Sequence, residues 1–434
     1  MDVRPVIKVE KLVFGGDGLG RAPDGKVVFV PFVIPGELVR VKLTRDLGDY
    51  YEAEVEEIIE ESPYRRPPSC PYYEVCGGCQ LQHIEYTHQL EIKKNILLDT
   101  FRHQRWEGEV PFEGIFPSPR EFHYRNRLRL HVEGQQLKMG FVKRKTHQVL
   151  KIKECLLAEP IVNQVLKGLY QHQVWFKFAF YSKRIKIESS PEEGKATIIF
   201  WTGVSPLREE LESLAEIPGV KCVFFWKKGR RPDGPFPKEA SYSGRRIFKN
   251  IDDMFYYVQP GVFVQTNWDV NLKIMEVVRS WKLDYETVLD LHAGIGNFLF
   301  PMGKSESVKT LIGVDTDPRA IEDAIFSAEK QGVNGRFDFR HMSAMEMLYD
   351  AVKYGETYDL VLLDPPRGGC KELLRLLEEV AKRYIVYVSC DLPTFVRDVK
   401  VLKQKGFELK RVYLFDMFPQ TYHFETVGLL EKKS

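Results

Sequence analysis

A cysteine at the end of an apolar segment is the residue of this chain best suited to covalent chemistry. Cys390 closes a segment that starts at Tyr384 and is typical of a buried strand with a polar end. Asp391 and Pro393 follow it, so the chain must come to the surface there. A free cysteine is more often an inert core residue, but this position favours a reactive thiol.

Two carboxylates also lie at the ends of apolar segments, as Cys390 does. Asp364 ends another apolar segment and precedes two prolines, which fix the backbone and suit the acid to orienting a planar ring. Glu425 opens the last apolar segment. A thiolate that adds to carbon 6 of a pyrimidine makes carbon 5 nucleophilic enough to accept a methyl group, and a base must then remove the carbon-5 proton. A cysteine, a ring-orienting acid and a carboxylate base are the groups that these steps need.

A glycine loop farther upstream indicates a nucleoside cofactor. It contains Gly294 and Gly296 and is followed by Asn297. About 20 residues later Asp315 ends a strand, where an acid can accept hydrogen bonds from both ribose hydroxyls. Leu299 stands where a dinucleotide site has its third glycine, so the pattern favours S-adenosylmethionine (SAM). The alternative is that the glycines serve only the turn.

The elements that must position these groups have the pattern of a parallel sheet. From Asn267 onward, apolar segments alternate with helical ones, which indicates βαβ units. Ligands bind at the carboxyl ends of such strands. We expect strands near 287–291, 310–315, 336–341, 359–363 and 385–389, helices over 317–331 and 371–382, and an antiparallel edge pair at 408–415 and 424–430.

The first part of the chain has a different pattern. Short alternating segments separated by glycine turns predict four or five strands in a small barrel of the oligonucleotide-binding type over residues 1–62. A proline-rich linker follows, then a helical segment over 84–104 and a β-rich region from 120 to about 260. At 434 residues, two or three domains are expected.

Charge and composition narrow the class of protein. The net charge is only +2, but three basic clusters point to a polyanion: Arg125, Arg127 and Arg129, then residues 143–145 and 227–231. No apolar run of about 18 residues occurs, so no transmembrane helix is expected. The N-terminus lacks the apolar segment of a signal peptide, so the expected location is the cytoplasm.

Three cysteines lie close together in a short loop with glycines, which indicates a metal site. Cys70, Cys76 and Cys79 are soft thiolate ligands, for which zinc and iron–sulfur are close rivals on spacing alone. The fourth ligand is open between Cys155, Cys222 and His83. The sequence around Cys222 is typical of core, and Cys370 stands at an expected helix start.

Taken together, these motifs resemble the RNA uracil-C5 methyltransferase family that makes 5-methyluridine, in the branch with an N-terminal TRAM domain and an iron–sulfur cluster. The similarity covers nearly the whole chain. Its motifs are Gly16-Asp-Gly-Leu-Gly-Arg21, Cys70-x5-Cys76-Gly-Gly-Cys79, Tyr124-Arg-Asn-Arg127, Phe263-Val-Gln-Thr-Asn267, Asp364-Pro-Pro-Arg-Gly368, Ser389-Cys390 and Phe418-Pro-x-Thr-x-His-x-Glu-Thr426.

The resemblance implies an α/β fold: a SAM-dependent methyltransferase sheet of the Rossmann type, an N-terminal OB-like TRAM barrel and a β-rich central iron–sulfur domain. The implied domains are 1–62, 68–262 and 263–434, with part of 93–125 packing on the last. Cys390 would be the nucleophile and Glu425 the base. The implied cofactor contacts are Gln265, His292, Gly294, Asn297, Asp315, Ser343 and Asp364, and the implied [4Fe–4S] ligands are Cys70, Cys76, Cys79 and Cys155.

Several positions depart from the family pattern. His292 replaces an aromatic Tyr or Phe, Ala293 replaces a Cys, and Asp315 stands where Glu is common. Ser343 occupies a variable contact. Asp391 follows the nucleophile where Asn is usual, and its negative charge should raise the pKa of the thiol.

The resemblance also bears on the substrate. Carrying both TRAM and cluster favours ribosomal RNA, most of all 23S rRNA, over transfer RNA. The target uridine should lie in a single-stranded loop, because the base must leave its stack to reach the thiol. The rivals are a tRNA uridine enzyme, an RNA cytosine-C5 methyltransferase and a non-catalytic RNA-binding protein. We expect a monomer that binds no membrane, with a cluster that is structural or, alternatively, senses redox state.

Overall fold

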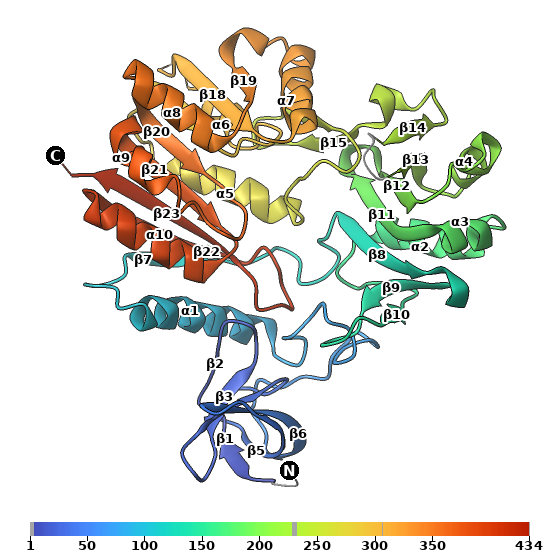
Figure 1. Ribbon diagram of the computed structural model, residues 1–434, viewed down its shortest axis with the longest axis vertical. Coiled ribbons are helices and arrows are strands. Elements are labelled where there is room, and N and C mark those ends of the chain that lie inside the picture. Colours follow the sequence, from blue (N-terminus) through green and yellow to red (C-terminus); the bar gives the residue numbers. More distant parts are fainter. Residues whose placement is uncertain (1–3, 228–231, 306, 434) are drawn as a thin grey trace.

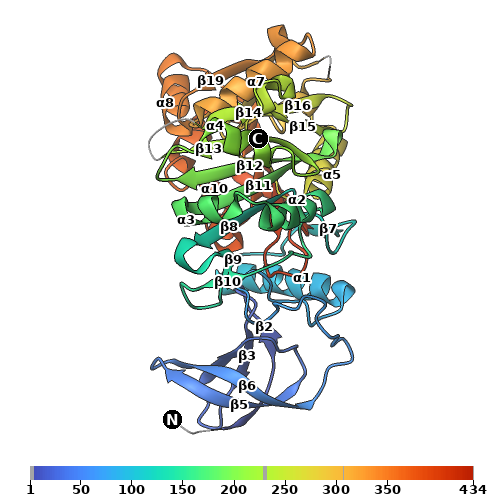
Figure 2. The ribbon, with the colours of Figure 1, turned by 90° about the vertical axis from the view of Figure 1, so that its right-hand side faces the viewer.

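The computed structural model describes residues 4–227, 232–305 and 307–433. Within these residues the strands form sheets of six, seven, eight and two strands. Figures 1 and 2 show the N-terminal sheet at one end of the long axis, and Figure 1 shows the central and C-terminal sheets beside each other toward the other end. No helix of the described chain combines the length and the apolarity needed to cross a membrane.

The N-terminal sheet is a small barrel around its own apolar core. Its strand order is β1-β5-β6-β4-β3-β2, and the core includes Ile7, Val28 and Val41. Its six strands exceed the four or five expected, and β2, of only two residues, was too short to be recognised in the sequence. The strands are β1 (Val6–Lys8), β2 (Lys11–Leu12), β3 (Gly18–Arg21), β4 (Val27–Val30), β5 (Leu38–Asp46) and β6 (Tyr50–Glu60).

The central sheet has the order β10-β9-β8-β11-β12-β13-β14 and is packed against helices. The expectation of a β-rich region missed these helices, which cover its apolar face. The strands are β8 (Arg127–Glu133), β9 (Lys138–Val142), β10 (Val149–Lys151), β11 (Ser182–Ser190), β12 (Lys195–Thr202), β13 (Val220–Trp226) and β14 (Asp233–Phe236). The helices are α2 (Pro160–Gln171), α3 (Trp175–Tyr181) and α4 (Arg208–Leu214).

The C-terminal sheet has the order β19-β18-β17-β20-β21-β23-β22-β7. Its first five strands are parallel and β23 is antiparallel to β21. The strands are β17 (Thr287–Asp290), β18 (Thr310–Asp315), β19 (Asp338–His341), β20 (Tyr358–Leu363), β21 (Ala381–Ser389), β22 (Phe407–Phe415) and β23 (Glu425–Lys432). The helices around it are α5 (Trp268–Ser280), α6 (Leu299–Met302), α7 (Pro318–Lys330), α8 (Ala344–Tyr354), α9 (Leu374–Val380) and α10 (Leu392–Gln404).

Two details of this sheet differ from the expected pattern. The helix expected over 371–382 is shorter, because β21 already begins at Ala381 and pairs there with β20. The pair β22 and β23 is antiparallel but does not form the edge. Strand β7 (Phe112–Phe116), from far upstream in the chain, runs parallel to β22 and covers it.

Segments from before position 263 also pack on this sheet. Helix α1 (Tyr86–His103) places Ile96 and Phe101 in one core with Phe395 of α10, and Figure 1 shows it between the barrel and the C-terminal sheet. The hairpin β15 (Arg246–Lys249) and β16 (Phe255–Val258) adds Phe248 and Tyr256 to the core on the other face. The C-terminal sheet therefore combines two stretches of the chain, β7 and β17–β23, while α1 and the β15–β16 hairpin pack on its two faces.

The residues of the predicted basic clusters differ in their exposure to solvent. Arg127 is half-buried, and its Nη1 donates to the carbonyl of Val264 at 2.6 Å, so it holds the chain and is less exposed than the expectation of a basic surface implied. Arg129 is exposed while Leu128 and Leu130 are buried, as the alternation predicts. Most of the cluster at 227–231 lies outside the described residues.

Candidate active site

The sheet brings the predicted nucleophile and base to the same edge. Strand β21 ends at Ser389, which pairs with Thr426 near the start of β23. Cys390 and Glu425 are the residues next to this pair, and because the strands are antiparallel, both lie at one end of the ladder. Asp364 follows β20, the parallel neighbour of β21, and lies at that same end.

The charges of these groups depend on one another. Burial raises the pKa of Cys390 to about 12, with further contributions from the negative charges of Glu425 and Asp364. Burial and then Asp364 raise the pKa of Glu425 well above its usual range, and burial raises the pKa of Asp364 to about 7. Three acidic groups that repel one another make a site that favours a cationic ligand.

Arg367 is a functional candidate for which the sequence suggested no role, although it stands in the Asp-Pro-Pro-Arg motif. Its guanidinium lowers the pKa of both Cys390 and Glu425, against the larger effect of burial. It thus favours the thiolate and the carboxylate, the forms that attack and accept a proton. A cationic side chain within a motif of acids and prolines was the available signal.

Asp391 has a structural explanation. It is the N-cap of α10, and its Oδ1 accepts a hydrogen bond from the Thr394 amide at 3.0 Å. Its charge raises the pKa of Cys390, as expected, but contributes less than burial, Glu425 or Asp364. The carboxylate of Asp391 therefore caps a helix and disfavours the thiolate less than burial, Glu425 or Asp364 does.

A cavity of about 520 Å³ lies beside the glycine loop. His292, Asp315 and Ser343 line it, which brings together three of the predicted cofactor contacts. The Gly294 amide donates to Asp315 Oδ2 at 2.9 Å, so the loop and the predicted ribose acid are already in contact. Gly296 has φ +81°, and a Cβ there would meet Phe300 at 2.8 Å, so the loop requires glycine.

Two of these residues have environments that the sequence did not indicate. Burial lowers the pKa of His292 to about 4, so its imidazole is neutral at physiological pH. Ser343 caps α8: its hydroxyl accepts from the Glu346 amide at 3.2 Å and donates to Glu346 Oε2 at 2.7 Å. Its hydroxyl therefore already has partners within the helix.

The remaining predicted contacts are held by neighbouring elements. Gln265 Nε2 donates to Asp364 Oδ2 at 3.2 Å, which links the segment before α5 to the end of β20. The side-chain amides of Asn297 and Asn271 exchange two hydrogen bonds of 2.9 Å, so Asn297 anchors the glycine loop to α5. Asp290 beneath the loop has its pKa raised to about 8 by burial, and its Oδ2 has no hydrogen-bond partner among the described residues.

The four predicted metal ligands surround a second cavity, of about 590 Å³, in the central region. Cys70, Cys76, Cys79 and Cys155 all line it and all are free thiols. Within the part of the chain that the structure describes, no group of three His, Cys, Asp or Glu side chains is close enough to hold a single metal ion. As placed, the four thiols line one cavity but do not form a single-ion site in this part of the chain.

The rival fourth ligands are engaged elsewhere. His83 Nδ1 lies 2.7 Å from the Tyr73 hydroxyl, and its Nε2 lies 3.3 Å from the Val33 carbonyl. Cys222 is buried in a separate apolar cluster, 3.6 Å from Thr197 Oγ1. Neither lines the cavity, whereas Cys155 does.

Comparison with known proteins agrees with this geometry. Residues 241–433 match the tRNA (Uracil-5-)-methyltransferase family model, and residues 6–55 match the TRAM domain. An "Uncharacterized RNA methyltransferase" of Aquifex aeolicus is 36% identical over 98% of both chains. The 23S rRNA (uracil(1939)-C(5))-methyltransferase RlmD of Francisella tularensis is 29% identical over 98% of this chain and 97% of its own.

A solved structure matches over the whole length. The tRNA (uracil-54, C5)-methyltransferase of Pyrococcus abyssi, in complex with S-adenosyl-L-homocysteine, has a TM-score of 0.73 and 25% identity over 99% of this chain and 100% of its own. The expected SAM-dependent methyltransferase fold and N-terminal TRAM domain are confirmed. The chain therefore belongs to the RNA uracil-C5 methyltransferase family and is a SAM-dependent enzyme of that family with an N-terminal TRAM domain.

Proposed function

We propose that this enzyme methylates carbon 5 of a uridine in 23S rRNA through a covalent bond between Cys390 and carbon 6 of the base. The observation that carries the mechanism is the ladder pair Ser389–Thr426, which sets Cys390 and Glu425 side by side at the end of the sheet. The relatives named as 23S rRNA enzymes, which align over nearly the whole chain, support the substrate.

Each residue then has a defined task. The Cys390 thiol passes its proton to water and its Sγ forms a bond to carbon 6, so the electron pair of the C5–C6 double bond moves to carbon 5 as an enolate. Asp364, which accepts a hydrogen bond of 3.2 Å from Gln265 Nε2, orients the pyrimidine ring. SAM supplies the methyl group that carbon 5 accepts, and S-adenosylhomocysteine is the leaving group. Glu425 removes the proton from carbon 5, the Sγ–C6 bond breaks, and the thiolate is released. Arg367 favours the charged forms of Cys390 and Glu425 throughout.

Glu425→Gln tests this assignment, because an amide cannot take up the carbon-5 proton. We expect the variant to transfer the methyl group and then remain attached to RNA, as a denaturant-resistant adduct on a gel. Wild-type enzyme on the same transcript is the control, since it should release its product. Loss of activity without an adduct would assign the base to another group.

A tRNA uridine is the second candidate substrate, because the solved relative of P. abyssi acts on tRNA. Unmodified 23S rRNA and tRNA transcripts, offered together with labelled SAM, distinguish the two. We expect label in 23S rRNA, as 5-methyluridine at an unpaired position. We also expect the enzyme to be a monomer in solution. Label in tRNA alone would overturn 23S rRNA as the proposed substrate. Label in 5-methylcytidine would overturn uridine as the proposed target nucleotide.

We further propose that Cys70, Cys76, Cys79 and Cys155 hold a [4Fe–4S] cluster. Four soft sulfur ligands around one cavity suit such a cluster, and the cavity is also lined by Arg125. The cluster would tie the 70–79 loop to the central sheet. Purified protein should contain iron and sulfide and absorb visible light; colourless protein with one zinc ion would refute the cluster.

A further inference from the structure

The segment between β22 and β23 leads directly to Glu425. It runs from Asp416 to Phe424, and Glu425 is the first residue of β23. Glu425 is fully buried, and its Oε2 has no hydrogen-bond partner in the described part of the chain. The place of this carboxylate is therefore set by the backbone that leads into it.

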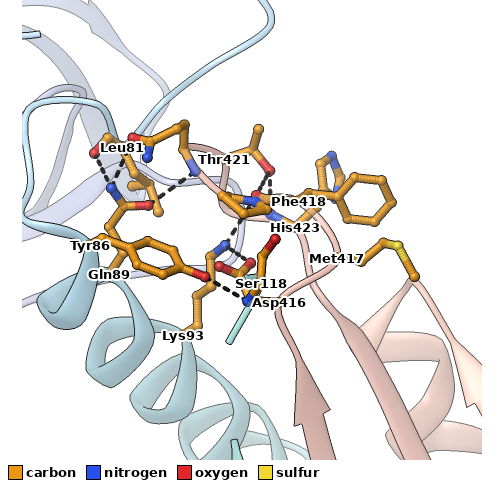
Figure 3. A network of polar contacts seen from close by, with 12 residues as sticks. Leu81, Tyr86, Gln89, Lys93, Ser118, Asp416, Met417, Phe418, Thr421 and His423 are labelled. Atoms are coloured by element: carbon orange, nitrogen blue, oxygen red, sulfur yellow. Dashed lines mark hydrogen bonds and ion pairs between the residues drawn. The ribbon is translucent and has the colours of Figure 1, made fainter. Parts of the chain in front are cut away.

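A lysine from helix α1 holds the start of this segment. Lys93 Nζ lies 2.5 Å from Asp416 Oδ1 and donates to the Phe418 carbonyl at 3.2 Å (Figure 3). Both charged side chains have no solvent exposure. Lys93 and Asp416 are 323 positions apart in the sequence, so the contact ties two distant parts of the chain.

A glutamine one turn earlier on α1 holds the middle of the segment. Gln89 Nε2 donates to Gln420 Oε1 at 3.0 Å, and Gln89 Oε1 accepts from the Gln420 amide at 3.1 Å. Gln420 has φ +69°, a left-handed conformation that a residue with a side chain adopts at a cost. Because Gln89 and Lys93 are four residues apart, they lie on one face of α1 and hold the segment at two points.

Other contacts fix the same backbone from different directions. The amides of Gln80 and Leu81 both donate to the Gln420 carbonyl, at 3.1 and 3.0 Å. The buried Tyr124 hydroxyl donates to the Pro419 carbonyl at 3.0 Å. Nothing in this network touches the predicted cofactor cavity, so its effect on chemistry must pass through the segment that leads to Glu425.

A buried ion pair is weak support for stability, because removing two charges from water costs about as much as their attraction returns. The buried pair of Lys93 and Asp416 is better explained by the backbone geometry that it imposes. We propose that Lys93 and Asp416, assisted by Gln89, position Glu425 for removal of the carbon-5 proton. This inference rests on the proposed role of Glu425.

The double variant Lys93→Met/Asp416→Asn tests it, because it removes both charges while keeping similar volumes. Lys94→Met is the matched control, since Lys94 is the next residue of α1 and is half-exposed. The measurements are thermal unfolding, SAM binding and single-turnover methylation of a 23S rRNA transcript. Methyl transfer and decay of the RNA–protein adduct are followed separately.

We expect the folded double variant to bind SAM and form adduct at the wild-type rate but to resolve it at least tenfold more slowly, whereas Lys94→Met matches wild type. A merely structural role would lower the fraction of active enzyme and leave the rate of adduct decay unchanged. Adduct decay at the wild-type rate would overturn the proposal. If the double variant does not fold, the rate of adduct decay is measured for Gln89→Met instead. Slower decay would support the proposal, and decay at the wild-type rate would overturn it.

Glu425→Gln in the same assay separates the two proposals. If Glu425→Gln traps no adduct, the role proposed for Glu425 fails. If it traps adduct and the double variant does not, only the positioning role of Lys93 and Asp416 fails.

Discussion

Two groups of thiols in this enzyme have different charged neighbours. Burial raises the pKa of Cys390, and the negative charges of Glu425 and Asp364 raise it further, so its surroundings are acidic. Burial also raises the pKa values of Cys70, Cys76, Cys79 and Cys155, but the positive charge of Arg125 opposes this rise at Cys76 and Cys155. Acidic neighbours keep a thiol protonated until a cationic ligand arrives, whereas a cationic neighbour favours the thiolate that metal ligation would need. The same side chain is thus held protonated by nearby acids in one place and partly relieved by a nearby arginine in the other.

The largest expected effect separates the two groups by function. Cys390→Ala should lower turnover by about 10³-fold or more, because it removes the group that is proposed to attack carbon 6. SAM binding, iron content and visible absorbance should match wild type. Residual methylation within tenfold of wild type would remove Cys390 from its role, and loss of iron would show that the two groups are not independent.

Substitution of a cysteine of the central cavity should lower the stability of the protein. Cys155→Ser should lose iron and visible absorbance and lower the free energy of unfolding by a few kcal/mol, since ligand binding by the native state contributes to folding. Cys390→Ser is the matched control, because it makes the same atomic change outside the cavity. An unchanged visible spectrum in Cys155→Ser would show that Cys155 is not a ligand.

The pH dependence of alkylation probes the acidic surroundings directly. With a pKa of about 12, Cys390 is almost entirely protonated at pH 8, and its alkylation rate should rise about tenfold per pH unit. Glu425→Gln removes a negative charge, so the pKa of the thiol should fall and alkylation at pH 8 should be roughly threefold faster or more. Cys390→Ala identifies the labelled residue, and an unchanged or slower rate in Glu425→Gln would show that the two groups do not interact.

Asp391→Asn should have the smallest effect. Asparagine caps a helix about as well as aspartate, so we expect a change in unfolding free energy of only a few tenths of a kcal/mol. Alkylation of Cys390 should become slightly faster, because a minor negative charge is removed. Asp391→Ala, which loses the cap, should cost about 1 kcal/mol. A large gain in alkylation rate for Asp391→Asn would mean that Asp391, and not Glu425, dominates the acidic surroundings.

The local patterns in the sequence predicted the elements of the C-terminal sheet closely. The strand expected at 310–315 is β18, and the helix expected over 317–331 differs from α7 by one residue at each end. Each of these elements shows its own apolar period. The helices of the central region also had a signal that the prediction passed over, because Val162, Val165, Leu166 and Leu169 follow helical spacing.

Contacts between distant segments could not be predicted in this way. Arg127 alternates with Arg129 as a solvent-facing pair would, yet it is only partly exposed, because its guanidinium contacts the Phe263 ring and the Val264 carbonyl. Lys93 belongs to a polar helical segment, and nothing nearby indicates that its partner is Asp416. Whether a charged side chain is buried depends on which distant segments of the chain pack against it. The hydrophobic periodicity of a local segment carries no information about those contacts.

Strand β7 has a consequence for the way the protein is made. It leaves the ribosome early, but its partner β22 follows after almost 300 more residues, so the sheet cannot be completed until nearly the whole chain has been synthesised. A fragment limited to residues 241–433 would leave β22 as an open edge, ready to pair with another copy. We therefore expect that this fragment aggregates on expression, and that supplying residues 80–120 in trans keeps more of it in solution.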